Sequence, residues 1–205
     1  MIRYRDASEL TYNLLPPEQQ LRLLQEEAAP CVAHLGRWHG ALWLFPTASL
    51  LILMGQGLWG VGALLGALGG VALTYRERRR WNALRRQAES LAVSVRGADA
   101  VAALLDFARW QGKEATECHN ALERLLPRLD TLSARQLSEA QRAYLRQCAE
   151  NQEPSVEVAV AALLVLASAG DTATAPIARQ LAASSSSQRI RDAAQLCLEE
   201  LHASE

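Results

Sequence analysis

Few residues in this chain are of the types that do chemistry, and their spacing does not suggest a reaction centre. Cys118 and His119 are the only adjacent Cys/His pair, and no second pair supplies the remaining ligands of a zinc site. His34 and His39 flank an apolar stretch; we expect them to lie at an interface, with a haem or pigment ligand as the alternative. No Gly-rich phosphate loop, HExxH, CxxC or nucleophile elbow is present. We therefore expect no enzyme activity, no catalytic or metal-binding residues, and no cofactor.

The composition favours an all-α protein in a reducing compartment. Of the 205 residues, 50% are hydrophobic and 21% charged, with a formal net charge of −1. This balance excludes collagen-like, disulfide-rich and disordered classes, and it excludes nucleic acid as an electrostatic partner. Ala and Leu, the strongest helix formers, dominate the chain. The four cysteines are widely separated, which is typical of apolar filling rather than of disulfides: Cys31, Cys118, Cys148 and Cys197.

A stretch without Asp, Glu, Lys or Arg runs from 38 to 75, between Arg37 and Arg76. It exceeds the roughly 20 residues that span a bilayer, and Gly55-Gln56-Gly57 is a turn signal at its middle. We predict a transmembrane hairpin with two spans, 38–54 and 58–75. One long tilted or kinked span is the alternative.

Three glycines at four-residue spacing share one face of the second predicted span: Gly62, Gly66 and Gly70. Such a face allows close approach of another helix in a membrane. The helix it packs against is either the first span of the same hairpin or a helix of a second copy or partner protein.

An Arg-rich segment, 76–96, is predicted to form a separate juxtamembrane helix after the hairpin, and it contains seven Arg against two Glu. Positive charge beside a span stays in the cytoplasm, so we expect a multi-pass protein of the cell inner membrane with both termini cytoplasmic. The cluster also favours contact with anionic lipid headgroups. Its candidate residues are Arg76, Arg78, Arg79, Arg80, Arg85 and Arg86.

The segment before the hairpin, 1–37, is predicted to be a cytoplasmic arm with a helix that starts at Pro17. Proline suits the first helical position, and acidic residues follow in the first turn. Leu21, Leu24 and Ala28 share a face. That face either packs against the rest of the protein or lies on the membrane surface.

The remaining segment, 97–205, mixes polar and apolar residues at helical spacing. Turn signals divide it into helices over 98–110, 115–129, 133–149, 155–169, 173–183 and 188–202. Ser133 is the predicted N-cap of the third helix, and Asp171 or Thr172 caps the fifth, with Pro176 in its first turn.

The end of this segment repeats at an offset of 32 residues. Ser155 aligns with Ser187, and Leu164 aligns with Leu196. Paired alanines allow close helix approach, and we expect the leucines to fill the space between layers. A helical pair repeated at such a period is typical of an α-solenoid.

The stretch 156–201 resembles HEAT repeats, especially the short type of phycobilisome-lyase-like proteins. The resemblance rests on the Ala-Ala-Leu-Leu helix, the Gly170-Asp171 break and the run from Arg189 to Ala194. It implies a small HEAT-like α-solenoid in which Arg191 takes the basic ladder position, although Ser184–Ser187 replaces the usual Asp. Residues 120–132 and 134–148 resemble a more diverged pair, and 98–117 a cap.

These features predict a membrane-anchored HEAT-repeat scaffold or adaptor that binds a protein partner at the cytoplasmic membrane face. An accessory subunit of a larger membrane complex is the alternative, with the glycine face packing against partner helices. A bilin lyase-like enzyme is a remote third reading, since fold resemblance alone does not transfer an activity. Expected partners are an unidentified protein, anionic lipids and a homo-oligomer or membrane complex, but not nucleic acid.

Overall fold

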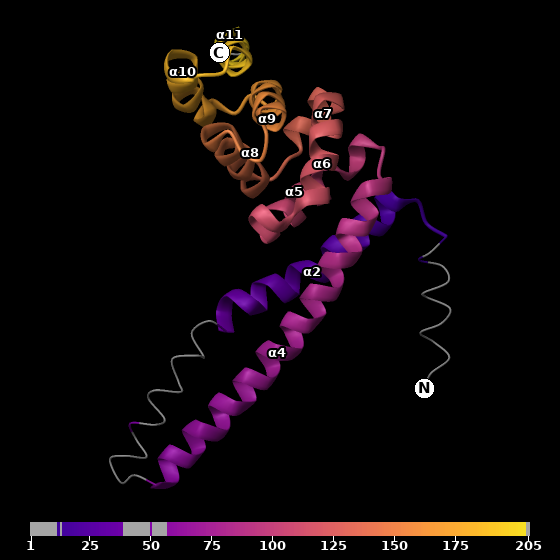
Figure 1. Cartoon of the computed structure of the whole chain (residues 1–205), viewed down its shortest axis with the longest axis vertical. Helices are drawn as coiled ribbons and strands as arrows, with labels where there is room; N and C mark the ends of the chain where they lie inside the picture. Colours follow the sequence, from indigo (N-terminus) through magenta and orange to yellow (C-terminus); the bar gives the residue numbers. More distant parts are fainter. Residues whose placement is uncertain (1–11, 13, 39–49, 51–56, 204–205) are drawn as a thin grey trace. The chain divides into compact units, whose positions relative to one another are not determined.

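The computed structural model describes residues 12, 14–38, 50 and 57–203, and every regular element among them is helical. The predicted all-α class is therefore confirmed. The described residues divide into two compact units: one holds those of Met1–Leu23 and Ala88–Glu205, and the other holds those of Leu24–Gln87. The helices are coloured along the chain in Figure 1.

Helix α2 (Pro17–Trp38) begins at the predicted proline, and Glu18 lies in its first turn. The face that carries Leu21, Leu24 and Ala28 is fully or almost fully buried. Packing against protein, one of the two alternatives for this face, is therefore what the structure shows. Glu18 also fastens the start of the helix, because its Oε1 accepts hydrogen bonds from the backbone N–H groups of Arg96 and Gly97, each at 3.2 Å.

Helix α4 (Gly57–Ser94) is a single helix of 38 residues. It contains both the second predicted span and most of the Arg-rich segment, which we had expected to be separate elements. In the unit Leu24–Gln87, the guanidinium of Arg80 on α4 bonds to Glu27 on α2 at 2.6 Å. This ion pair joins the two helices across 53 residues of sequence.

The predicted first span, 38–54, lies almost entirely outside the described residues. Gly62, Gly66 and Gly70 lie on α4, but their surroundings are outside what the structure describes, so the packing of the glycine face stays a prediction. Within the part of the chain that the structure describes, no helix has the length and apolar character needed to cross a membrane.

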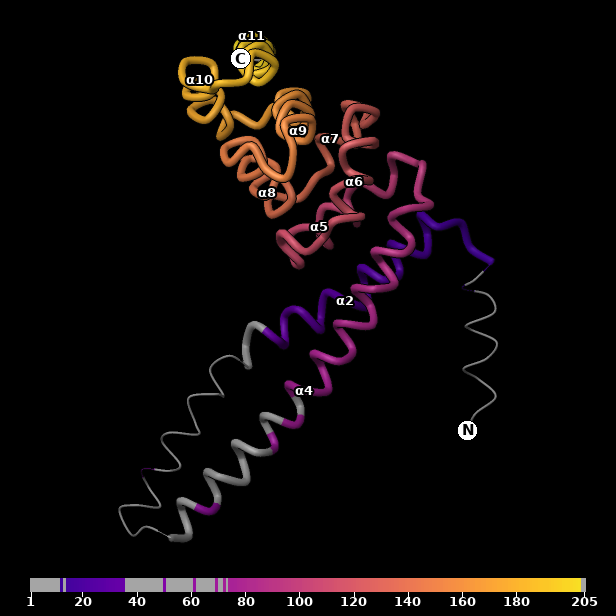
Figure 2. The backbone as a smooth tube through the Cα atoms, viewed as in Figure 1, coloured from indigo at the N-terminus to yellow at the C-terminus, as the bar shows by residue number. Residues whose placement is uncertain are grey.

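The remaining helices form an α-solenoid-like stack in the other unit, visible as successive paired coils in Figure 2. Helix α5 packs against α6, α8 against α9, and α10 against α11, and α9 also packs against α11 and against the α6–α7 region. The elements are η2 (Ala98–Ala100), α5 (Val101–Gln111), η3 (Gly112–Glu114), α6 (Thr116–Leu125), η4 (Leu126–Arg128), α7 (Thr131–Arg135), α8 (Glu139–Asn151), α9 (Val156–Ser168), η5 (Thr172–Thr174), α10 (Ala175–Ser184) and α11 (Gln188–Ala203).

This pairing differs from the predicted one. Residues 120–132 and 134–148 do not form one repeat, because α6 pairs with α5 and α8 pairs with α9. The stack therefore contains three successive helical pairs. One row of helices consists of the α6–α7 region, α9 and α11, and these are neighbours in that order.

The predicted helix 133–149 is interrupted, and Ser133 is not an N-cap. Asp130 caps α7 instead, accepting a hydrogen bond from the Ser133 backbone N–H at 2.9 Å. Ser138 then starts α8 with a capping box, in which its backbone and side chain exchange bonds with Gln141. The prediction that Pro176 lies in the first turn of its helix is confirmed.

Candidate functional site

A groove of about 440 Å³ runs along the row formed by the α6–α7 region, α9 and α11. Its lining is mainly apolar, with charged groups from three different elements at its edge. The lining residues are Glu123, Arg124, Leu126, Pro127, Leu129, Glu157, Val160, Ala161, Leu164, Val165, Ser168 and Arg189. A concave apolar surface of this volume lies within the range of ligand-binding clefts in proteins.

Three leucines, which we call the leucine ladder, recur on this row at intervals of 32 residues: Leu132 on α7, Leu164 on α9 and Leu196 on α11. Their exposed fractions are 73%, 38% and 55%. Leu164 and Leu196 were expected to fill the space between layers, and that expectation is wrong. Leu164 and Leu196 are each the ninth residue of their helix, whereas Leu132 is the second residue of the short helix α7. All three leave apolar area in water.

Polar contacts with the same 32-residue spacing hold the row in register. Arg189 on α11 bonds to Glu157 on α9 at 2.6 Å. The Ser155 hydroxyl, just before α9, donates to Glu123 on α6 at 3.0 Å. Each contact joins residues that are 32 apart in the sequence and lie on neighbouring elements of the row.

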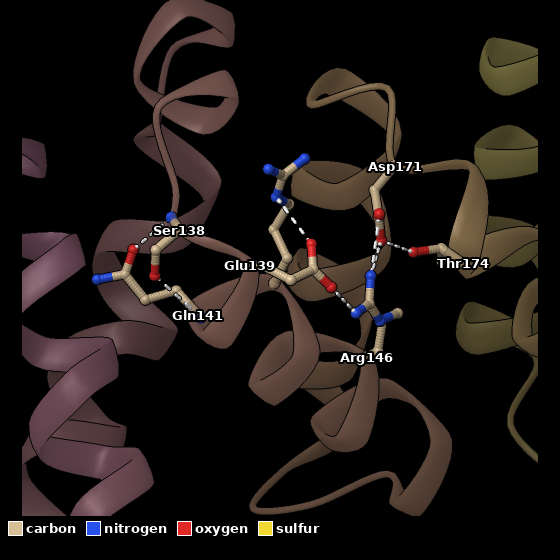
Figure 3. Close-up of polar contacts among 7 residues, drawn as sticks. Ser138, Glu139, Gln141, Arg146, Asp171 and Thr174 are labelled. Atoms are coloured by element: carbon tan, nitrogen blue, oxygen red, sulfur yellow. Dashed lines mark hydrogen bonds and ion pairs between the residues drawn. The ribbon is translucent and has the colours of Figure 1, made fainter.

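A buried ion pair fixes the turn between α9 and α10. The Nη1 of Arg146 on α8 reaches both carboxylate oxygens of Asp171, at 2.9 and 2.7 Å (Figure 3). The hydroxyl of Thr174 donates to the same carboxylate at 2.6 Å, and Arg146 also bonds to Glu139. These bonds raise the pKa of the Arg146 guanidinium, the Glu139 bond being the largest cause. Asp171 is thus a ligand of Arg146, and its side chain does not cap the following helix.

A second network joins the first helical pair to the second. Gln141, buried at the start of α8, donates its amide to the Ala102 carbonyl and to Asp106, both at 3.0 Å. Asp106 also accepts a bond from Arg109, at 3.3 Å. Together with the Arg146–Asp171 pair, this network positions α8 and α9, and through them the groove.

Arg191, which takes the predicted basic HEAT position, bonds to the preceding turn although the usual Asp is absent there. Its Nη1 donates to the backbone carbonyl of Ser185 at 2.5 Å, and its Nη2 bonds to Gln188. The arginine therefore binds the preceding turn, but through a carbonyl dipole instead of a carboxylate.

The Arg-rich segment presents most of its guanidinium groups to solvent. Arg76, Arg78, Arg79, Arg80 and Arg86 are exposed, and Arg85 is half-buried. The Arg80 side chain is held by Glu27, and Nε of Arg86 donates to the Asn82 carbonyl. Cys31 is buried on α2 in the same unit, and burial raises the pKa of its thiol.

Cys118 and His119 do not form a ligand pair. Cys118 is buried in the core, while His119 lines a separate pocket of about 310 Å³. There the His119 Nε2 and the Tyr144 hydroxyl are hydrogen bonded at 2.8 Å. Burial lowers the pKa of the imidazole, opposed by the charge of Glu89, and it raises the pKa of the Tyr144 hydroxyl.

Cys148 lies in the same pocket, and burial raises the pKa of its thiol to about 11. The thiol is therefore protonated at neutral pH and is a poor nucleophile. Among the described residues, no group of three or more His, Cys, Asp or Glu is placed to hold a metal ion. His34 is exposed near the end of α2, and His39 lies outside the described residues.

Comparisons with known proteins give no match. No protein-family model, no curated protein and no solved structure is similar to the chain at the significance required.

The groove and its leucine ladder were missed in the sequence, although the signal was present. The 32-residue repeat aligns Leu164 with Leu196, and Leu132 lies a further 32 residues back in the sequence. The repeat does not show which side of each helix faces solvent, since the leucines two positions later align equally well but are less exposed. Leu166 is fully buried, and its repeat partner Leu198 is half-buried.

Proposed function

We propose that this protein is a membrane-anchored helical-repeat scaffold that binds a protein partner through the groove at the cytoplasmic face of the inner membrane. The observation that carries the proposal is the leucine ladder. Leu164 and Leu196 are exposed at the same position of α9 and α11, and exposed Leu132 lies on α7 in the same row. Extended apolar surfaces of this kind are how solenoids bind other proteins.

The anchor in this proposal is the two-span hairpin 38–54 and 58–75. The charge-free stretch 38–75 supports it. Residues 58–75 belong to α4, and at 1.5 Å per residue they extend about 27 Å, close to the thickness of a bilayer core. Tyr75 is exposed at the point where the arginines begin, which suits the membrane interface.

In this proposal the arginines of α4 have different roles, because α4 is one continuous helix. Arg76, Arg78 and Arg79 are exposed within the first turn after Tyr75, so they reach the headgroup layer. Arg85 and Arg86 lie about 15 Å beyond Tyr75 along the helix, past most of that layer. We expect the first three to provide most of the attraction to anionic lipid, at about 1 kcal/mol per residue.

The anchor is tested by membrane fractionation and by reporter fusions at both termini. A chain that resists alkaline extraction, with both reporters cytoplasmic, is the expected result. Replacing Arg76, Arg78 and Arg79 with Gln should weaken binding to anionic vesicles more than replacing Arg85 and Arg86. A protein that leaves the membrane in alkaline carbonate would disprove the hairpin.

The groove is tested by purification from native membranes, comparing Leu164→Gln with the wild type. Leu23→Gln is a matched control, because Leu23 is similarly exposed, at 45%, but lies on α2. We expect partner recovery to fall with Leu164→Gln and to be unchanged with Leu23→Gln. If recovery instead depends on Gly62 and Gly66, replaced with Leu, the protein acts as a subunit through its membrane helices.

A further inference from the structure

The pocket of about 310 Å³ that contains His119, which we call the His119 pocket, has the carboxyl ends of two helices at its mouth. Gly112 and Lys113 line it and directly follow α5. Asn151 is the last residue of α8, and Glu153 lies two residues beyond it; both also line the pocket. The carbonyl groups at the C-terminus of a helix carry a partial negative charge, equivalent to about half an electron. Two such ends at one mouth favour a cationic group there.

The protein itself places a cation at this mouth. Lys113, the only lysine in the sequence, donates a hydrogen bond from Nζ to Oε1 of Glu153 at 3.0 Å. The two side chains are 85% and 53% exposed, so water screens their attraction and the pair contributes little to stability. A second ammonium group can therefore replace Lys113 beside Glu153 at little cost, because the lysine side chain is free to turn into solvent.

The groups at the inner end of the pocket do not repel a cation. His119 lies in the first turns of α6, whose amino end carries a partial positive charge. That end is neutralised by Glu89, because its Oε2 accepts a hydrogen bond from the backbone N–H of Glu117 at 2.7 Å. Burial lowers the pKa of His119, so its imidazole is neutral at pH 7. The partial positive charge of the helix is thus compensated, and the imidazole brings none.

The interior of the pocket suits a short apolar stem. The side chains of His119 and Cys148 are buried, and the Tyr144 ring and Pro154 complete the wall. The volume of the pocket is at the lower end of the range for small-molecule sites. The Tyr144 hydroxyl, hydrogen bonded to Nε2 of His119 at 2.8 Å, can also accept a bond, since a hydroxyl has two lone pairs besides its proton.

We propose that the His119 pocket binds a small organic cation, a primary ammonium group on a short apolar stem. The ammonium lies beside Glu153 at the ends of α5 and α8, and the stem lies against Tyr144 and Cys148. This site goes beyond the scaffold function and is separate from the groove, because the two share no lining residue. The same chemical group occurs in free alkylamines and in the lysine side chain of a protein, and the experiment distinguishes these sources.

Ligand-observed NMR titrations of the full chain in zwitterionic lipid nanodiscs test the proposal, with empty nanodiscs as the blank. The probes are n-pentylamine, neutral n-pentanol, anionic pentanoate and Nα-acetyl-lysine amide. A ligand as small as pentylamine should bind with a Kd of about 1 mM. It should bind about fivefold more tightly than pentanol, which has the same stem without the charge. Pentanoate, which brings a negative charge to a negative mouth, should bind more weakly still.

Two variants at the mouth should shift the affinity for pentylamine in opposite directions. Lys113→Met should tighten binding about threefold, because it removes the cation that competes for Glu153. Glu153→Gln should weaken binding about fivefold, because it removes the carboxylate. Glu150→Gln is the matched control, since Glu150 is an exposed acid near the end of α8 that does not line the pocket. Its affinity for pentylamine should equal that of the wild type.

Equal binding of pentylamine and pentanol, equal affinities of the wild type and Lys113→Met, or no signal for pentylamine at about 10 mM, ten times the expected Kd, would overturn the proposal. Circular dichroism of each variant verifies that the stack is folded. The acetylated lysine then identifies the source of the cation. If it binds as tightly as pentylamine, the site accepts a lysine side chain of a protein, and if it binds about tenfold more weakly, the site is specific for a free amine.

Discussion

The ion pair between Arg146 and Asp171 should contribute more to the stability of the stack than any exposed pair. The side chains are 15% and 7% exposed, so water screens their attraction weakly. Asp171→Ala removes both bonds to Arg146 and the bond from Thr174. Breaking one side of a buried pair typically costs 3–5 kcal/mol. Arg146 keeps Glu139 as a partner, so we take the lower end, about 3 kcal/mol.

Glu139→Ala is the matched control, because it removes the other carboxylate bound to the same arginine. Glu139 is the largest cause of the raised pKa of Arg146, but its side chain is 70% exposed. An exposed partner is screened by water, so we expect a loss of only about 0.5 kcal/mol. The two variants thus separate burial from the mere presence of a charge.

Hydrogen exchange of the full chain, followed by mass spectrometry, measures the difference. Amides in α9 and α10 open with the turn that Asp171 holds, so Asp171→Ala should exchange there about a hundredfold faster. Glu139→Ala should change the rate about twofold. The double variant Arg146→Met, Asp171→Leu should recover most of the protection, since apolar residues of similar volume often replace a buried pair without loss.

Equal acceleration by Asp171→Ala and Glu139→Ala would refute this reasoning. It would mean that the buried pair is no stronger than a surface contact, and that the turn between α9 and α10 is held by the packing of the helices. Acceleration by the double variant as large as by Asp171→Ala alone would show that the specific geometry of the pair matters, beyond the cost of an unpaired charge.

Three further predictions concern single residues. Burial lowers the pKa of His119, so just below pH 6.5 the unfolded chain binds more protons than the folded one. Stability should therefore fall as the pH drops from 7 to 5. Thermal melts of His119→Gln should show a weaker dependence of the melting temperature on pH. Burial raises the thiol pKa of Cys148 and Cys197 to about 11, so iodoacetamide at pH 7.5 should label them only after unfolding, as read by mass spectrometry. Gly112 has φ 61° and ψ −138°, a conformation open essentially to glycine, so Gly112→Ala should cost about 1–3 kcal/mol in a melt; an unchanged melting temperature would contradict this.

Local chemistry made several elements predictable from the sequence. Pro17 with Glu18 marked the start of α2, and the 32-residue repeat indicated that α9 and α11 are equivalent helices of a stack. The interruption before α8 was missed, although Ser138 and Gln141 are spaced as a capping box. Asp130, three residues before Ser133, caps α7 instead, because its carboxylate accepts hydrogen bonds from both the backbone N–H and the hydroxyl of Ser133.

Other features depend on contacts that no local pattern encodes. The exposure of Leu164 and the burial of Leu166, two residues apart, follow from which neighbouring helices each side of α9 meets. The groove exists only because η4, α9 and α11 pack in that order. The ion pair of Asp171 likewise could not be predicted locally, because its partner Arg146 lies 25 residues earlier on another helix.

The order of helical pairs in the stack has a mechanical consequence. The α8–α9 pair has neighbours on both sides, whereas the α10–α11 pair packs on its preceding neighbours alone among the described helices. In an array whose units contact only adjacent units, the end unit opens first. A pulling force on the C-terminus should therefore open the stack one helical pair at a time, starting at α11. The first event would separate Arg189 from Glu157 and remove Leu196 from the row.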